Sequence, residues 1–253
     1  MYKNYFYLNR LITELNELLR GFILLEAFSQ ERDKLILDFL SSDGDHRFII
    51  ISVSQNEPYI LLKNDYHRAK KNSISFFRNR LPITLNSVEI ATDDRIIKFG
   101  FNDCSLFFAI RGKDTNIILL DKDTVHEEFK KISELTEAKL LKDIQGKQYS
   151  PYLHKPYFEK NTRGIDFRLL IKDNFPFISK DILSEVYFRA GNKNDFNELC
   201  DILSSVIDEI HNEKISVFYD LRLNKVIFAP ATFRIYDRTE DRLFETYLSA
   251  IND

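Results

Sequence analysis

The spacing of apolar residues changes abruptly at Gly21, and this change limits the folds open to the chain. Before Gly21, apolar residues recur at helical spacing over residues 4–20 and fall on one face. After it, short segments alternate apolar and polar residues with a period of two, as far as Leu120. One amphipathic helix followed by many short strands favours a β-sandwich or a partly closed barrel.

Segments rich in Ile, Leu and Phe are predicted to be the strands of this domain. They span residues 22–28, 34–40, 47–53, 58–62, 85–91, 95–101, 105–111 and 116–120. A polar stretch at residues 63–72 interrupts the series, and a short helix is predicted over residues 73–81, ending before Pro82. On the first helix, the stripe expected to be buried consists of Leu8, Leu11, Ile12 and Leu15.

A different pattern begins after residue 122. It predicts an amphipathic helix at residues 125–141, a loop at 145–164, helices at 165–171, 180–190 and 195–211, a hairpin of 215–219 with 225–228, and a last helix at 242–251. Ser179 is a suitable N-cap for one of these helices, and Gly191 a suitable end. The expected fold class is therefore α+β, with a β-sandwich-like domain at residues 1–160 and a small, mainly helical domain at 161–253.

Composition and motifs argue against several classes of function. With 36 Lys and Arg against 39 Asp and Glu, the net charge is −3, which disfavours a uniformly basic nucleic-acid-binding protein but allows a local basic face. The two cysteines are too few for a four-thiolate zinc site, and the five histidines lack ligand spacing. No phosphate-binding loop, G-x-S-x-G or H-E-x-x-H motif occurs. We therefore expect no metal, no cofactor and no small-molecule substrate.

The sequence also lacks the signals of a membrane or secreted protein. Its densest apolar run, at residues 48–53, is far shorter than the roughly 20 residues of a spanning helix. The N-terminus lacks the charged-then-apolar order of a signal peptide. We expect a cytoplasmic protein with no membrane partner.

The local charge distribution points to one basic segment. From Tyr66 to Val88 there is no acidic residue. The cations in this segment, which are candidates for binding RNA phosphates, are Arg68, Lys70, Lys71, Arg78 and Arg80. The alternative is that Phe76 and Phe77 dock the segment onto the core while the cations are only solvated.

Two further groups of polar residues stand at strand ends. Asp94 and Arg95 precede a strand with a core pattern, and together they offer a carboxylate acceptor and a bidentate donor suited to RNA. Arg95 could equally pair with a local carboxylate in a structural turn. In the turn at residues 111–116, Gly112 permits a tight bend, and Lys113 and Asn116 are first of all turn residues.

The order of these parts resembles a known family. The first helix (Asn4-Tyr5-Phe6-Tyr7-Leu8), the strand entry Asp94-Arg95-Ile96-Ile97 and the turn Gly112-Lys113-x-Thr115-Asn116 are similar to the N-terminal domain of the NFACT proteins, the group of bacterial RqcH and animal NEMF. In bacteria this group is often labelled fibronectin-binding protein A. The segment from Ile182 to Gly191 resembles the second helix of the family's helix-hairpin-helix domain.

This resemblance implies a function in ribosome-associated quality control. NFACT proteins bind large ribosomal subunits that hold stalled peptidyl-tRNA, and they recruit tRNA so that C-terminal tails are added without mRNA. The family's tRNA-engaging pair falls on Asp94 and Arg95, and further RNA contacts would come from the basic segment and from Asn4, Lys113 and Asn116. Because the ribosome makes the peptide bond, the resemblance implies a protein that is not an enzyme.

Three departures from the family pattern are visible. Many members have Asp where this chain has Asn4. The hairpin at residues 174–179 lacks the glycines that let a helix-hairpin-helix backbone approach a phosphate, so we do not expect that unit to bind nucleic acid directly. The family's coiled coil and C-terminal RNA-binding domain are absent from the sequence, and we expect the chain to be a fragment of a longer protein.

Two rival functions belong to other classes. The family label suggests an extracellular-matrix adhesin that binds fibronectin. The N-terminal domain also looks like that of the Fpg/Nei DNA glycosylases, which need an N-terminal Pro followed by Glu after Met removal. Here Tyr2 and Lys3 occupy those positions, so an inactive relative would be the most that this likeness implies.

Overall fold

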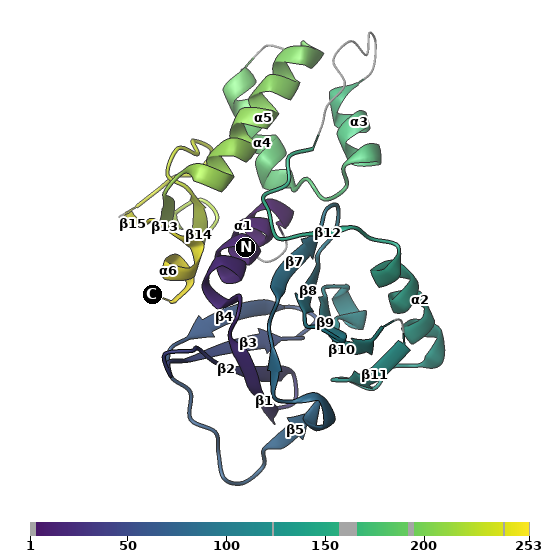
Figure 1. Ribbon diagram of the computed structural model, residues 1–253. Coiled ribbons are helices and arrows are strands. Elements are labelled where there is room, and N and C mark those ends of the chain that lie inside the picture. The colour runs from purple at the N-terminus through teal and green to yellow at the C-terminus, as the bar shows by residue number, and fades with distance from the viewer. Residues whose placement is uncertain (1–3, 123, 157–165, 192–194, 240, 253) are drawn as a thin grey trace. The chain divides into compact units, whose positions relative to one another are not determined.

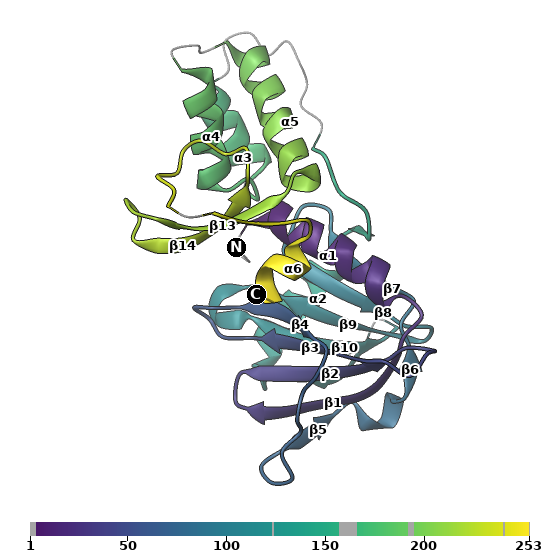
Figure 2. The same ribbon diagram turned by 90° about the vertical axis from the view of Figure 1, so that its left-hand side faces the viewer.

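The computed structural model describes residues 4–122, 124–156, 166–191, 195–239 and 241–252 (Figures 1 and 2). The chain forms two compact units. The sheet unit comprises Ile12–Tyr152, and the helical unit comprises the residues up to Leu11 together with Leu153–Ile251. The boundary predicted at residue 160 lies outside the described residues.

Helix α1 (Tyr5–Leu19) confirms the first predicted element. Its apolar stripe is buried as expected, because Leu8, Leu11, Ile12 and Leu15 are at most 1% exposed. Gly21 follows the helix at φ +88°, a conformation that favours glycine. The first part of α1, up to Leu11, belongs to the helical unit and the rest to the sheet unit.

The sheet unit contains two six-stranded antiparallel sheets, confirming an α+β fold with many strands. The first has the order β4-β3-β2-β1-β5, with β6 also paired to β1, and the second has the order β11-β10-β9-β8-β7-β12. The strands of the first sheet are β1 (Ile23–Glu31), β2 (Lys34–Leu40), β3 (His46–Ser52), β4 (Tyr59–Lys63), β5 (Ile74–Phe76) and β6 (Ile83–Thr84). Those of the second are β7 (Ser87–Ala91), β8 (Ile96–Gly100), β9 (Cys104–Ala109), β10 (Asn116–Asp121), β11 (Thr124–Glu128) and β12 (Tyr149–Ser150).

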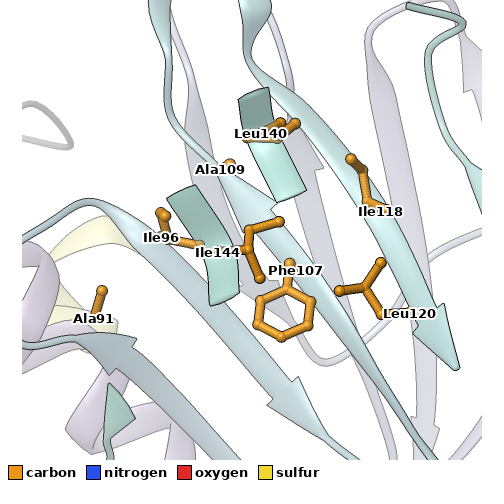
Figure 3. Close-up of a cluster of buried hydrophobic side chains, with 8 residues drawn as sticks. All are labelled: Ala91, Ile96, Phe107, Ala109, Ile118, Leu120, Leu140 and Ile144. Atoms are coloured by element: carbon orange, nitrogen blue, oxygen red, sulfur yellow. The ribbon is translucent and has the colours of Figure 1, made fainter. Parts of the chain in front are cut away.

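Strand β10 is buried on both faces, which explains its uninterrupted apolar sequence. On one face, Ile118 and Leu120 pack with Leu140 and Ile144 of helix α2 (Glu134–Gln145), as Figure 3 shows. On the other face, Leu119 lines a small apolar gap together with Leu24 of the first sheet, so the two sheets face each other. The sheet unit is thus layered as sheet, sheet and helix.

Two helices of the sheet unit were predicted wrongly. Residues 73–81 form β5 and a single 3₁₀ turn (Arg78–Arg80) instead of a helix. The edge of β1 offers unpaired backbone groups, and residues 74–76 pair with it in antiparallel register. Residues 125–141 are divided between β11, which pairs with β10, and α2, which starts only after its N-cap Ser133. In both places pairing with a sheet edge overrides the local helical pattern.

The helical unit contains three helices that match the predicted ones in order. They are α3 (Phe167–Asn174), α4 (Lys180–Ala190) and α5 (Phe196–Asn212). Ser179 caps α4 by accepting a hydrogen bond from the Ile182 N–H, and Gly191 ends it at φ +59°. Strands β13 (Ile215–Asp220) and β14 (Lys225–Pro230) form the predicted hairpin. Residues 242–251 are not one helix, because β15 (Arg242–Phe244) pairs with β13 before helix α6 (Tyr247–Asn252) begins.

A buried carboxylate ties the parts of the helical unit together. Glu185 of α4 is fully buried and accepts hydrogen bonds from the backbone N–H groups of Arg234 and Ile235 at 3.0–3.1 Å. It also accepts from Arg189 Nε at 2.7 Å, and the other guanidinium nitrogens of Arg189 pair with Glu209 of α5 at 2.5 and 2.7 Å. These hydrogen bonds connect α4, α5 and the loop after β14, and each carboxylate oxygen of Glu185 and Glu209 has a donor.

Among the described helices, none is both long enough and apolar enough to cross a membrane.

Candidate RNA interface

The turn between β7 and β8 carries Asp94 and Arg95, and the structure gives the two residues different surroundings. Asp94 forms a two-pronged pair with Arg111, which follows β9, at 2.9 and 2.5 Å. The pairing arises from the sheet register, because Ile96 lies opposite Ala109 and brings the β7–β8 turn beside the end of β9. Although burial alone would lower it, the pKa of Arg111 is raised by hydrogen bonding and charge from Asp94 and Asp143. Asp94 therefore orients Arg111.

More charges extend this pair into a cluster at one end of the second sheet. Asp143 of α2 accepts from Arg111 Nε at 3.3 Å. Lys147 lies 2.9 Å from Asp93 and 3.7 Å from Asp94. Each of these side chains is exposed by half or less, so the cluster is partly shielded from water. It fixes the geometry of the turn that presents Arg95.

Arg95 is the cation of this cluster that stays available. Its side chain is half-buried, and within the described residues it forms no ion pair and donates no side-chain hydrogen bond. Burial lowers the pKa of Arg95 and nearby Asp94 opposes that effect, yet an arginine stays charged at any physiological pH. A partly desolvated guanidinium without a partner favours an anion that can accept its hydrogen bonds.

The turn after Arg111 is structural, as its sequence indicated. Thr115 Oγ1 accepts a hydrogen bond from the Arg111 N–H at 2.9 Å. Asn116 is fully buried, and its side-chain amide pairs with the backbone N–H and carbonyl of Lys130 at 2.9 and 2.8 Å. Lys113 is exposed and has no ion pair within the described residues. Of the two predicted RNA contacts in this turn, only Lys113 presents its polar group to solvent.

Arg68 of the basic segment serves the packing of the first sheet. Its guanidinium lies 4.6 Å from the ring centre of Phe28 and donates to Glu26, Ser73 and Ser75 at 2.7–2.9 Å. It thereby covers a cluster of buried apolar residues on the outer face of that sheet, formed by Phe28, Ile36, Phe48 and Ile50. All of its donor nitrogens are engaged within the fold.

The other cations of the segment divide into paired and free groups. Arg80 pairs with Asp121 at the end of β10. Lys70, Lys71 and Arg78 are exposed and form no ion pair within the described part of the chain. Phe77 is buried, which agrees with the alternative that the aromatic residues dock this segment. Three free cations therefore remain on the surface.

Asn4 has a structural position. It is 6% exposed, its Oδ1 accepts from the Phe6 N–H at 3.1 Å, and its Nδ2 donates to Ser179 Oγ at 2.8 Å. It caps the start of α1 and reaches the N-cap residue of α4. The proposed RNA contact by Asn4 stays a prediction.

The chain matches, over residues 4–253, the family described as NFACT N-terminal and middle domains. It belongs to that family. The expected resemblance is thus confirmed across nearly the whole sequence. A comparison with curated proteins gives no match. The described residues contain no group of three or more His, Cys, Asp or Glu side chains that could hold a metal ion.

Two solved NFACT-type structures have the same fold. The fibrinogen binding protein from Staphylococcus aureus aligns with a TM-score of 0.69 at 14% identity, covering 98% of this chain and 97% of that chain. The N-terminal part of the fibronectin/fibrinogen-binding protein from Streptococcus suis aligns with a TM-score of 0.63 at 17% identity, covering 98% and 96%. The family and these neighbours are not enzyme families.

Sequence reasoning missed the partner of Asp94. The sequence placed Arg111 at the end of a predicted strand and the start of a turn. Asp143 lay just beyond the helix predicted to end at residue 141, and Lys147 lay in a predicted loop. A signal was present, since a carboxylate in a tight turn needs a donor, but the choice between Arg95 and Arg111 depends on the register of β8 and β9. That register is a tertiary property.

Proposed function

We propose that this protein is the tRNA-engaging part of a ribosome-associated quality-control factor. In this role it acts in the cytoplasm, binds large ribosomal subunits that hold peptidyl-tRNA, and supports the addition of C-terminal tails without mRNA. The family match supports this class of factor in general. The observation that carries the tRNA contact is the half-buried guanidinium of Arg95, which has no ion-pair partner among the described residues and lies beside the Asp94–Arg111 pair.

Arg95 is the proposed contact to a tRNA phosphate or base edge, and Asp94 positions the turn. A guanidinium can donate two parallel hydrogen bonds to a phosphate, and such a charge-assisted contact is worth about 1–3 kcal/mol. Lys70, Lys71, Arg78 and Lys113 add electrostatic attraction without base specificity. Substitution of Arg95 should therefore weaken tRNA binding more than loss of another single charge.

The experiment compares Arg95→Gln with Arg20→Gln. Both variants lose one positive charge from the sheet unit, and Arg20 is exposed on the surface. Binding of unfractionated tRNA to the purified chain should weaken about tenfold or more for Arg95→Gln, and by much less for Arg20→Gln. Equal effects of the two substitutions would leave only non-specific attraction and contradict the proposal.

The names of the two structural neighbours favour one second candidate, binding to fibronectin or fibrinogen. Surface-immobilised fibronectin and fibrinogen test it directly, with the same two variants. Saturable binding that is unaffected by Arg95→Gln, together with no tRNA binding, would favour this function over the first.

A further inference from the structure

The helical unit contains a pocket that the proposed tRNA contact does not use. It lies against α3, α4 and the connection between them and has a volume of about 550 Å³. Its walls are apolar, with side chains from Ile171, Phe175, Ile178, Leu183 and Tyr187. Pockets of about 300–1,000 Å³ with mainly apolar walls are typical binding sites.

The rim of this pocket is positively charged. Arg168, Lys172 and Lys180 line it, and no acidic residue of the described part of the chain does. All three are exposed, and none forms an ion pair within the described residues. In a chain with net charge −3, three unpaired cations around one apolar pocket form a local positive field that suits an anionic partner.

Several features disfavour a nucleic acid as the occupant. Arg168 already lies over the Tyr187 ring, 5.3 Å from its centre, on a face where a base would stack. In the connection between the helices, the Phe175 N–H donates to Ile171 and the Ile178 N–H to Phe175, while Pro176 has no N–H. These backbone groups are therefore not available for a phosphate. Apart from the hydroxyl groups of Ser184 and Tyr187, the remaining walls offer hydrocarbon surface, which has little hydrogen-bonding capacity for base edges.

We propose that this pocket binds an apolar segment of another protein that is flanked by acidic side chains. Large apolar side chains of the partner fill the space between α3 and α4. Glutamate or aspartate carboxylates beside them pair with Lys172, Lys180 and Arg168 at the rim. This is the pattern by which an amphipathic helix occupies a groove. The proposal does not depend on tRNA binding.

The test uses two fluorescein-labelled peptides of about 15 residues, a length at which helices begin to form. Both carry Leu at helical spacing on one face, and the other face carries Glu in one peptide and Lys in the other. Fluorescence anisotropy should show saturable binding of the Glu peptide to the full chain and at least about tenfold weaker binding of the Lys peptide. No saturable binding of the Glu peptide, or equal binding of both, would overturn the proposal.

Charge reversal then locates the site. Lys172→Glu combined with Lys180→Glu should weaken binding of the Glu peptide at least about tenfold, because two attractive contacts become repulsive. The matched control reverses two exposed lysines of α2, Lys139→Glu with Lys142→Glu, and should leave binding unchanged. Equal effects of the two reversals would overturn the proposal.

Methyl NMR and an RNA probe complete the test. The Glu peptide should shift the methyl resonances of Ile171, Ile178 and Leu183, and leave those of Ile49 and Ile51 in β3 unchanged. The reversed pocket variant should bind a labelled single-stranded RNA as well as the unmodified chain does. If the reversal weakens RNA binding and the Glu peptide gives no pocket shifts, the pocket binds RNA and the proposal is wrong.

Discussion

At the residue scale, we expect loss of the Asp94 side chain to lower the stability of the fold and loss of the Arg95 side chain to leave it nearly unchanged. Asp94→Ala leaves the partly buried Arg111 without its two-pronged partner, so the free energy of unfolding should fall by about 1–3 kcal/mol. Arg95→Ala removes no contact of this kind, and the change should be within about 0.5 kcal/mol. Urea denaturation measures both values. Equal stabilities of the two variants would contradict the assignment of Asp94 as a positioning residue.

His211 of α5 is expected to make stability depend on pH. The side chain is 5% exposed, neither ring nitrogen has a hydrogen-bond partner within the described residues, and burial lowers the pKa to about 4. Among nearby charges, Asp208 opposes this shift, and Lys155, Arg10 and His154 reinforce it. Because the unfolded chain binds a proton at about pH 6.5, the contribution of neutral His211 is complete above that pH and is lost as the pH falls towards 4.

The measurement compares the unmodified chain with His211→Phe, since a phenyl ring fits beside Phe6, whose ring centre lies 5.9 Å from that of His211. The difference in free energy of unfolding between the two proteins should change by up to about 3 kcal/mol between pH 7 and pH 4, in favour of the variant at low pH. Subtracting the two curves removes the titration of groups that they share. Parallel curves would mean that His211 can be protonated in the folded protein.

At the element scale, Glu185 should be more important to the helical unit than its position in the middle of α4 indicates. Glu185→Ala removes one partner of Arg189 and leaves the backbone N–H groups of Arg234 and Ile235 without an acceptor. The free energy of unfolding should therefore fall by about 3–5 kcal/mol. Glu213→Ala is the matched control, because that side chain is exposed after the end of α5. Thermal unfolding followed by circular dichroism distinguishes the two. A melting temperature for Glu185→Ala equal to that of the control would contradict the role of the network.

The elements that sequence patterns predicted well are those whose signals are local. Helix α1 has a single apolar stripe and a terminal glycine, and α4 has a serine cap and a glycine end. The β13–β14 hairpin likewise consists of two short apolar stretches on the two sides of a turn. Residues 74–76, 125–128 and 242–244 were predicted as parts of helices. They became strands because β1, β10 and β13 offered edges to pair with.

The candidate site was predicted in part for the same reason. Arg95 at a strand entry is visible in the sequence, and the structure places it, half-buried, at the turn between β7 and β8. The burial of Asn4 and Asn116 and the engagement of Arg68 depend on contacts with residues far along the chain, Ser179, Lys130 and Glu26 respectively. The spacing of residues within one segment does not predict those contacts.

At the scale of the whole molecule, RNA affinity should depend on salt less steeply than the number of basic residues implies. Arg68 and Arg80 are occupied by carboxylates. The candidates that stay available are Lys70, Lys71, Arg78, Arg95 and Lys113. At roughly 0.7 per phosphate neutralised on a single strand, the log–log slope of binding against salt should lie between about −1 and −3.5. A titration at several NaCl concentrations measures it, and a much steeper slope would require cations outside this set.

The division of α1 between two units has a consequence for how such a protein can arise. Residues up to Leu11 belong with Leu153–Ile251, and the intervening chain folds as the sheet unit. The helical unit is therefore encoded by two separate stretches of the gene. A recombination event that transferred only the stretch for Leu153–Ile251 would leave behind the first turns of α1. Domain shuffling moves continuous coding segments, so it cannot move the complete helical unit without the sheet unit that lies between its two stretches. We expect a complete helical unit to be inherited together with the sheet unit.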